Sequence, residues 1–241
     1  MLRHHILLGC VALSLTLAAP AARANLVSNG GFETTTHGPG QFDNNTVATG
    51  WSSNGYNFIF AAGTADTTGS SGQYGAVSLW GPNNGSANGL PAASPDGGNY
   101  VGADGAFSVG AITQTVFGLT VGSKYALSFD WAGAQQSGFN GATTEQWQVT
   151  FGNQSQSTEI VAIPSHGFSG WMSKTFIYTA SNTSQLLSFL AIGTPSGEPP
   201  FSLLDGVSLD AVAAPEPATL SILGLGLAAI AGLRRRAKSA V

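Results

Sequence analysis

This chain of 241 residues contains residue types that could carry catalysis, but they do not form a known catalytic sequence motif. A hydrolase needs a positioned acid and base, or a nucleophile with its base. Beyond the first 24 residues the only histidines are His37 and His166, and no G-x-S-x-G, H-E-x-x-H or Walker motif occurs. Eleven acids occur from Glu33 to Asp210, and the sequence does not single out a glycosidase pair among them. We therefore expect no enzymatic activity and keep a surface glycoside hydrolase as the weaker alternative.

Sugar binding is the chemistry that the residue types favour. Aromatic rings stack on the apolar faces of sugars, and asparagine side chains supply directional hydrogen bonds. Trp80 begins a segment, residues 80–99, that is poor in strand formers and contains Asn83, Asn84 and Asn99. These four residues are the candidate ligand-binding set, although the asparagines also suit turns. With 8% charged residues, the chain favours a neutral polysaccharide over a sulfated or uronic one.

The elements that must position these residues are β-strands. Tyr125, Leu127 and Phe129 alternate with small or polar residues, which is the period of a strand buried on one face. The predicted strands span residues 26–32, 56–60, 76–80, 100–103, 112–117, 124–131, 146–151, 173–179, 186–192 and 203–211. Turns rich in glycine, asparagine and aspartate separate them, Asp96 and Asp104 among their residues, so we expect an all-β sandwich or jelly roll. Four tryptophans are expected in its core: Trp51, Trp131, Trp147 and Trp171.

Composition excludes several other classes of protein. With 33 glycines and 8% charged residues, the chain is not a coiled coil or a long helical bundle. A net charge of −4 offers no basic field to a nucleic acid, so we expect no nucleic-acid partner. A hydrophobic content of 43% argues against a disordered chain. Between Arg23 and Arg234 only Lys124 and Lys174 are basic, against all 12 acids, so this stretch is strongly acidic.

The N-terminus has the parts of a secretory signal peptide. Arg3 precedes an apolar run over residues 6–19, and Ala22-Arg23-Ala24 forms an A-x-A site before Asn25. We expect signal peptidase to cut between Ala24 and Asn25. The single cysteine, at position 10, is removed with the signal, which excludes disulfides and thiolate metal sites from the exported chain.

The C-terminus has three parts in a fixed order. A Pro-Glu-Pro tripeptide precedes an uncharged run over residues 218–233, and a cluster of arginines follows it. The run would span about 24 Å as a helix, slightly less than the roughly 30 Å hydrocarbon core of a membrane. The charged and tripeptide residues are Pro215, Glu216, Pro217, Arg234, Arg235 and Arg236.

This order resembles the PEP-CTERM sorting signal of Gram-negative bacteria, which is also catalogued as an ice-binding protein C-terminal segment. The resemblance implies a single transmembrane helix and recognition by an exosortase-like membrane transpeptidase. It also implies transient anchoring in the inner membrane, followed by a place at the cell surface or outside the cell. The alternative is an ordinary single-pass anchor. No T-x-T repeat of fixed period occurs, so ice binding is not expected.

Five short motifs follow one another between the two ends. They are residues 25–33 (NLVSNGGFE), 112–116 (ITQTV), 122–125 (GSKY), 170–171 (GW) and 204–209 (LDGVSL). Their order resembles galactose-binding-like jelly rolls and carbohydrate-binding modules, which implies a jelly-roll β-sandwich. The resemblance also implies a structural calcium ion held by an acid near each end of the domain, at the positions of Glu33 and Asp205. Many relatives carry a second acid where this chain has Gly206. No other cofactor is expected.

The predicted organisation is a signal peptide (1–24), a β-sandwich domain (25–212) and a PEP-CTERM sorting signal (213–241). We expect an exported, non-enzymatic protein of the cell surface or extracellular matrix that binds exopolysaccharide through its β-sandwich. The alternative is a structural or adhesion protein of the matrix with no small ligand.

Overall fold

The computed structural model describes residues 25–213. The predicted signal peptide and transmembrane helix lie outside these residues and stay predictions. Within the described part of the chain, no helix is long and apolar enough to cross a membrane. The strands are β1 (Gly40–Gln41), β2 (Ser52–Ser53), β3 (Asn57–Phe60), β4 (Tyr100–Asp104), β5 (Ile112–Phe117), β6 (Lys124–Gln135), β7 (Thr143–Phe151), β8 (Gln154–Ser157), β9 (Val161–Ile163), β10 (Met172–Thr179), β11 (Ser184–Thr194) and β12 (Pro200–Ala211).

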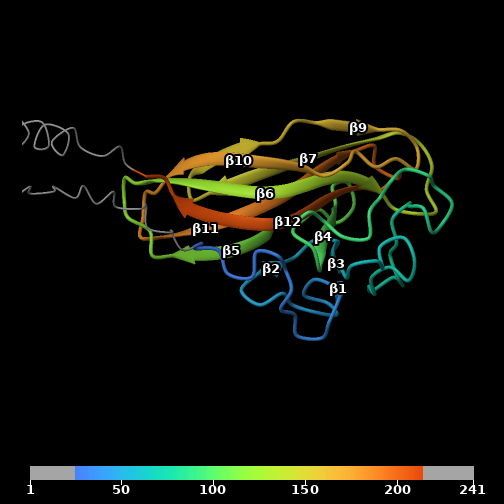
Figure 1. The fold of residues 1–241 in the computed structure, drawn as a ribbon, viewed down its shortest axis with the longest axis horizontal. Coiled ribbons are helices and arrows are strands. Elements are labelled where there is room, and N and C mark those ends of the chain that lie inside the picture. Colours follow the sequence, from blue (N-terminus) through green and yellow to red (C-terminus); the bar gives the residue numbers. More distant parts are fainter. Residues whose placement is uncertain (1–24, 214–241) are drawn as a thin grey trace, which may run out of the picture.

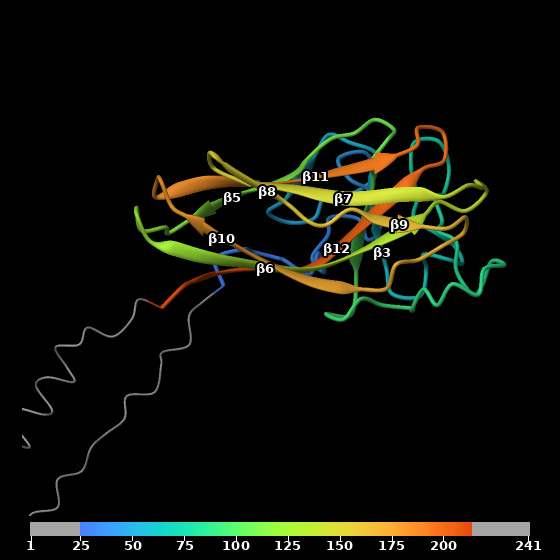
Figure 2. The ribbon, with the colours of Figure 1, turned by 90° about the horizontal axis from the view of Figure 1, so that it is seen from above.

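The strands form two antiparallel sheets (Figure 1), which the view turned by 90° shows packed face to face (Figure 2). The first sheet has the order β1-β3-β4-β12-β6-β10, and the second has the order β2-β5-β11-β7-β8, with β9 also paired to β7. From β4 to β7 and from β10 to β12, consecutive strands lie in alternate sheets, and β12 returns to lie between β4 and β6. This connectivity is a jelly roll, and the predicted all-β sandwich is confirmed.

The main core lies between the two sheets. Alternate residues of β7 are buried, so Trp147, Val149 and Phe151 point inward. Trp51 and Trp131 are buried in the same core, as predicted. The indole Nε1 of Trp147 donates to the carbonyl of Leu203 at 2.9 Å, which satisfies its polar group inside the core.

Two predicted strands are absent, and several short ones were not predicted. Residues 26–32 and 76–80 form turns and isolated bridges rather than strands. In the first of these segments, a Cβ at Gly30 would lie 1.9 Å from the carbonyl oxygen of Val207, so the chain passes β12 too closely for a side chain. The short strands β1, β2, β8 and β9 were missed because two to four residues give no readable alternation.

A long loop covers the outer face of the first sheet. Residues 61–99 contain no strand and lie over a second hydrophobic cluster. Phe60, Tyr100 and Phe201 come to this cluster from the sheet, and Leu79 and Leu90 come from the loop. The loop predicted over residues 80–99 is therefore present, and it shields a second core. Trp171 packs partly buried against this second core rather than in the main one.

The two ends of the described chain lie at one end of the sandwich. Figures 1 and 2 show the chain entering and leaving at the same end. The backbone N–H of Leu26 donates to the carbonyl of Leu209 at 3.0 Å, which joins the first segment to the end of β12. At the opposite end, Pro200 of β12 pairs with Gln135 of β6, and Phe201 pairs with Asp104 of β4. The loops that leave β4 and β6 and the loop that enters β12 therefore meet far from the termini.

Candidate functional site

A pocket of 300 Å³ lies where these loops meet. Tyr56 precedes β3 and Asp104 ends β4, while the other lining residues come from the β4–β5, β6–β7 and β11–β12 connections. The residues that line the pocket are Tyr56, Asp104, Ala106, Phe107, Gln136, Phe139, Ser196, Gly197 and Pro199.

Aromatic rings form the walls of this pocket and its rim. Tyr56 and Phe107 meet edge to face, with ring centroids 5.2 Å apart and an interplanar angle of 90°. The ring centroid of Tyr74 lies 6.0 Å from that of Tyr56 and 6.2 Å from that of Phe107, so the three rings pack against one another. Phe107 is 47% exposed, Phe139 37% and Tyr74 71%. Such a group of exposed rings costs free energy in water and is typical of a binding surface.

Asp104 is the carboxyl group of the pocket. It is only 1% exposed, and its Oδ1 accepts the backbone N–H groups of Ala106 at 2.8 Å and Phe107 at 3.0 Å. This is the turn geometry expected for an aspartate that precedes glycine. Its Oδ2 is buried without a hydrogen-bond partner. Burial raises the pKa of Asp104 to about 6, although the two backbone hydrogen bonds act in the other direction. Asp104 therefore brings to the wall of the pocket one carboxylate oxygen that has no partner within the described residues.

Trp80, the aromatic residue chosen from the sequence, borders this pocket. Its Nε1 donates to the carbonyl of Phe139 at 2.8 Å. One face of its ring stacks on His166, with centroids 3.9 Å apart. His166 Nε2 in turn lies 2.7 Å from Asn140 Oδ1. Trp80 thus fixes the β6–β7 loop that carries Phe139, and direct contact of Trp80 with a ligand stays a prediction.

The three candidate asparagines make hydrogen bonds within the protein. Asn83 Nδ2 donates to both carboxylate oxygens of Asp66 at 3.1 Å. Asn84 Nδ2 donates to the carbonyl of Leu79 at 2.7 Å. Asn99 Nδ2 donates to the carbonyl of Phe32 at 3.1 Å. Each amide therefore has a role in loop structure, and ligand binding by these residues stays a prediction.

The two acids predicted to hold calcium lie close together. A Cβ built on Gly31 would lie 3.7 Å from Asp205 Oδ1 and 3.8 Å from Glu33 Cγ, and 3.0 Å from Asp96 Oδ2. Asp96, assigned to a turn from the sequence, is therefore a third acid at this place. Gly206 has φ of 58° at the irregularity in β12, a backbone conformation that disfavours the second acid found in relatives.

Asp205 is a buried acid with one carboxylate oxygen that lacks a hydrogen-bond partner. It is fully buried, Ser94 Oγ donates to its Oδ2, and its Oδ1 has no hydrogen-bond partner. Burial is the main cause that raises the pKa of Asp205 to about 8, and the charges of Asp96 and Glu33 add to it. In residues 25–213 no three His, Cys, Asp or Glu side chains form a group that could hold a metal ion. A calcium ion here would therefore need backbone carbonyl oxygens besides the carboxylates.

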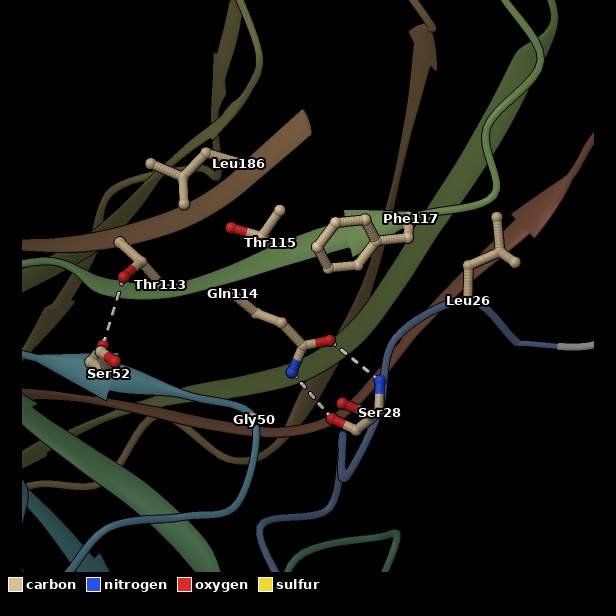
Figure 3. Close-up of a pocket in the computed structure, with 9 residues that line it drawn as sticks. All are labelled: Leu26, Ser28, Gly50, Ser52, Thr113, Gln114, Thr115, Phe117 and Leu186. Atoms are coloured by element: carbon tan, nitrogen blue, oxygen red, sulfur yellow. Dashed lines mark hydrogen bonds between the residues drawn. The ribbon is translucent and has the colours of Figure 1, made fainter. Parts of the chain in front are cut away.

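A second hollow, of 470 Å³, lies on the outer face of the second sheet (Figure 3). Its one amide side chain is held within the protein. Gln114 Oε1 accepts the N–H of Ser28 and Gln114 Nε2 donates to the carbonyl of Ser28, both at 2.9 Å. The exposed apolar side chains here are Phe117, with 68% exposure, and Leu186. With a single ring, this hollow is less suited to stacking on a sugar than the aromatic pocket.

The sequence contained one signal for the aromatic pocket that was not used. Phe107 lies within residues 104–110 (DGAFSVG), where it breaks the strand alternation inside a turn segment. Phe107 is large and apolar, and side chains of this kind that gather at a surface are typical of a binding site. The neighbours of Phe107 across the pocket come from distant loops, and only the fold brings them together.

Comparison with known proteins gives one family match, at the C-terminal end. Residues 213–236 match the model of the PEP-CTERM protein-sorting motif. The predicted sorting signal is therefore confirmed, and it marks an exported protein that an exosortase-type system sorts to the cell surface. A search of curated proteins found no match.

Several solved structures share a likeness with the described domain. TmCBM61 in complex with β-1,4-galactotriose is 18% identical over 78% of this chain and 99% of its own, with a TM-score of 0.45. A structure titled "CBM4 structure and function" is 17% identical over 77% of this chain and 99% of its own, with a TM-score of 0.35. The CBM22-1 xylan-binding domain of Paenibacillus barcinonensis Xyn10C is 11% identical over 65% and 94%, with a TM-score of 0.34.

Proposed function

We propose that this exported protein is a non-enzymatic polysaccharide-binding protein of the cell surface or extracellular polymer matrix. The observation that carries the proposal is the aromatic pocket at the end of the sandwich opposite the termini. Exposed rings stand there beside a buried carboxylate oxygen without a partner. Rings that stack on sugar faces and a small number of placed polar groups are the usual means of binding a saccharide.

The position of the pocket supports this role. The sorting motif begins directly after β12, and the pocket lies beside the first residue of the same strand. Twelve residues of strand, at about 3.3 Å each, separate the two ends by about 40 Å. The pocket therefore lies at the end of the domain far from the tail, which is expected to be held in the inner membrane until exosortase cuts it. After release, the same pocket is open to polymer.

The chemistry of the pocket supports binding rather than hydrolysis. Glycosidases place two carboxyl groups on either side of the bond to be cut. Among the residues that line the pocket, Asp104 is the one acid, and its Oδ1 is occupied by two backbone N–H groups. No histidine and no second carboxyl group line it.

Replacing Phe107 with alanine tests the proposal. The loss of a stacking ring at a binding hot spot is expected to weaken polysaccharide binding by at least about tenfold. Phe117→Ala is the matched control, because Phe117 is even more exposed and lies in the hollow of the second sheet. The affinities are measured by isothermal titration with a polysaccharide that the unaltered protein binds. Equal affinities of the two variants would place the site elsewhere.

We further propose that Glu33 and Asp205 hold a calcium ion that joins the N-terminal segment to β12. The unpartnered Oδ1 of Asp205 supports this proposal, because a cation there would supply the missing partner. Calcium at a hundredfold excess over its dissociation constant adds about 2.7 kcal/mol of stability. For a domain of this size that corresponds to a rise in Tm of roughly 5–10 °C.

The calcium proposal is checked by thermal melting with calcium and with a chelator. Glu33→Gln and Asp205→Asn are expected to abolish the rise in Tm. Asp210→Asn, on the same strand but away from the cluster around Gly31, is expected to keep it. Identical midpoints of the unaltered protein with calcium and with chelator would reject the site.

A further inference from the structure

We propose that the aromatic pocket selects a polysaccharide that carries free, protonated amino groups, with Asp104 as the counter-ion and the surrounding rings as the walls. The ligand class is therefore a cationic amino-sugar polymer. This inference rests on the proposed polysaccharide-binding function and names the ligand class of that same site.

The first argument is the missing counter-ion of Asp104. Its Oδ1 is held by two backbone N–H groups, whereas its Oδ2 is buried with no partner. In residues 25–213 the basic side chains besides histidine are Lys124 and Lys174. Lys174 pairs with Glu159 at 2.5 Å, and Lys124 begins β6 at the end near the termini. A buried carboxylate without a cation is costly, and a ligand ammonium group would offset that cost more fully than a sugar hydroxyl.

The second argument is the arrangement of the rings beside this carboxylate. Tyr56 and Phe107 stand perpendicular to each other, with centroids 5.2 Å apart, and Phe139 lines the same pocket. The faces of aromatic rings attract cations, and the attraction is strongest where water is excluded. Aromatic walls around a carboxylate are the surroundings that an ammonium group prefers. A neutral sugar would use the rings for stacking but would leave the charge of Asp104 unpaired.

The third argument is the net charge of the domain as a whole. The two lysines stand against eleven acids in residues 25–213. Such a surface attracts a polycation and repels uronic or sulfated polymers. The low content of charged residues favoured a neutral ligand in the sequence analysis. The excess of acids over lysines favours a positively charged ligand instead.

Titration of the full chain in a neutral detergent with three hexasaccharides at pH 6 tests the inference. The ligands are β-1,4-linked glucosamine, its N-acetylated form and the glucose hexamer of the same length and linkage. The glucosamine hexamer is expected to bind at least about tenfold more tightly than the other two, from ion pairing and cation–π attraction.

Asp104→Asn is expected to abolish this preference. The asparagine Oδ1 can still accept both backbone N–H groups, so the variant is expected to fold, and its melting curve checks this. Glu145→Gln is the matched control, because it makes the same carboxyl-to-amide change at another buried acid that has an unpartnered oxygen and does not line the pocket. It is expected to keep the preference.

Three outcomes would overturn the inference. If Asp104→Asn kept the preference, or if the acetylated and glucose hexamers bound as tightly as the glucosamine hexamer, the amine would not be the recognised group, while polysaccharide binding itself would stand. If the glucosamine hexamer did not bind, the amino-sugar inference would fail. The proposed function would then still be decided by Phe107→Ala and by the wider range of neutral polysaccharides.

Discussion

Replacing Glu145 with glutamine is expected to leave stability almost unchanged near pH 4 and to raise it by roughly 4 kcal/mol near pH 9. Glu145 points between the sheets, Thr143 donates to its Oε1, and its Oε2 has no partner. Burial raises the pKa of Glu145 from 4.5 to about 8, although the hydrogen bond from Thr143 opposes the rise. The amide of glutamine resembles the protonated carboxyl in shape and cannot lose a proton.

The sign of this effect follows from proton binding. Between pH 4.5 and about 8 the folded state holds a proton on Glu145 that the unfolded state has lost. The free energy of unfolding therefore falls as the pH rises through this window. Asp205 and Asp104 have raised pKa values as well, of about 8 and about 6, and they act in the same direction. Calcium would remove the contribution of Asp205 if it binds there.

Denaturant unfolding of residues 25–213 at pH 4, 7 and 9 measures the effect. Glu159→Gln is the matched control, because it removes the same charge from an exposed acid whose pKa is lowered mainly by its hydrogen bond with Lys174. That variant is expected to show a small change of opposite sign. A pH dependence of Glu145→Gln that is as steep as that of the unaltered protein would contradict the account of Glu145.

Replacing Pro215, Glu216 and Pro217 with alanines is expected to prevent the sorting of nearly all exported molecules. These residues lie within the matched sorting motif, directly before its uncharged run. Exosortase-type processing requires recognition of this motif. The variant is therefore expected to stay uncut in the inner membrane.

Cell fractionation shows where the variant is found, and the mass of the protein in each fraction shows whether the tail has been cut. Alanine at Lys238 and Ser239, which lie beyond the matched residues 213–236, is the control and is expected to leave sorting intact. Release of the alanine-triplet variant at the normal size would show that the tripeptide does not direct sorting.

Much of the fold could be predicted because alternation is a local signal. Strands with one face on the core, such as β7 and β10, repeat large apolar residues at every second position. Residues 76–80 have the composition of a strand, yet they form only isolated bridges within the long loop. Their apolar side chains enter the second core, which no local pattern reveals.

The candidate site was less predictable because its parts meet only in the folded chain. Trp80 was chosen because it borders a long loop, and the structure places it against Phe139 of the aromatic pocket. Asp104 was expected to form a turn, which it does through Oδ1, but the unpaired Oδ2 depends on burial by distant loops. The resemblance to carbohydrate-binding modules predicts that Glu33 and Asp205 lie together. Asp96 lies beside them because the long loop brings it there, which the sequence does not show.

The measurement that tests the central claim most directly is binding of residues 25–213 to an array of polysaccharides and oligosaccharides. The account predicts binding to at least one saccharide, retained by Phe117→Ala and weakened by at least about tenfold in Phe107→Ala. Absence of binding to every saccharide on the array, by a protein with an intact melting transition, would contradict it.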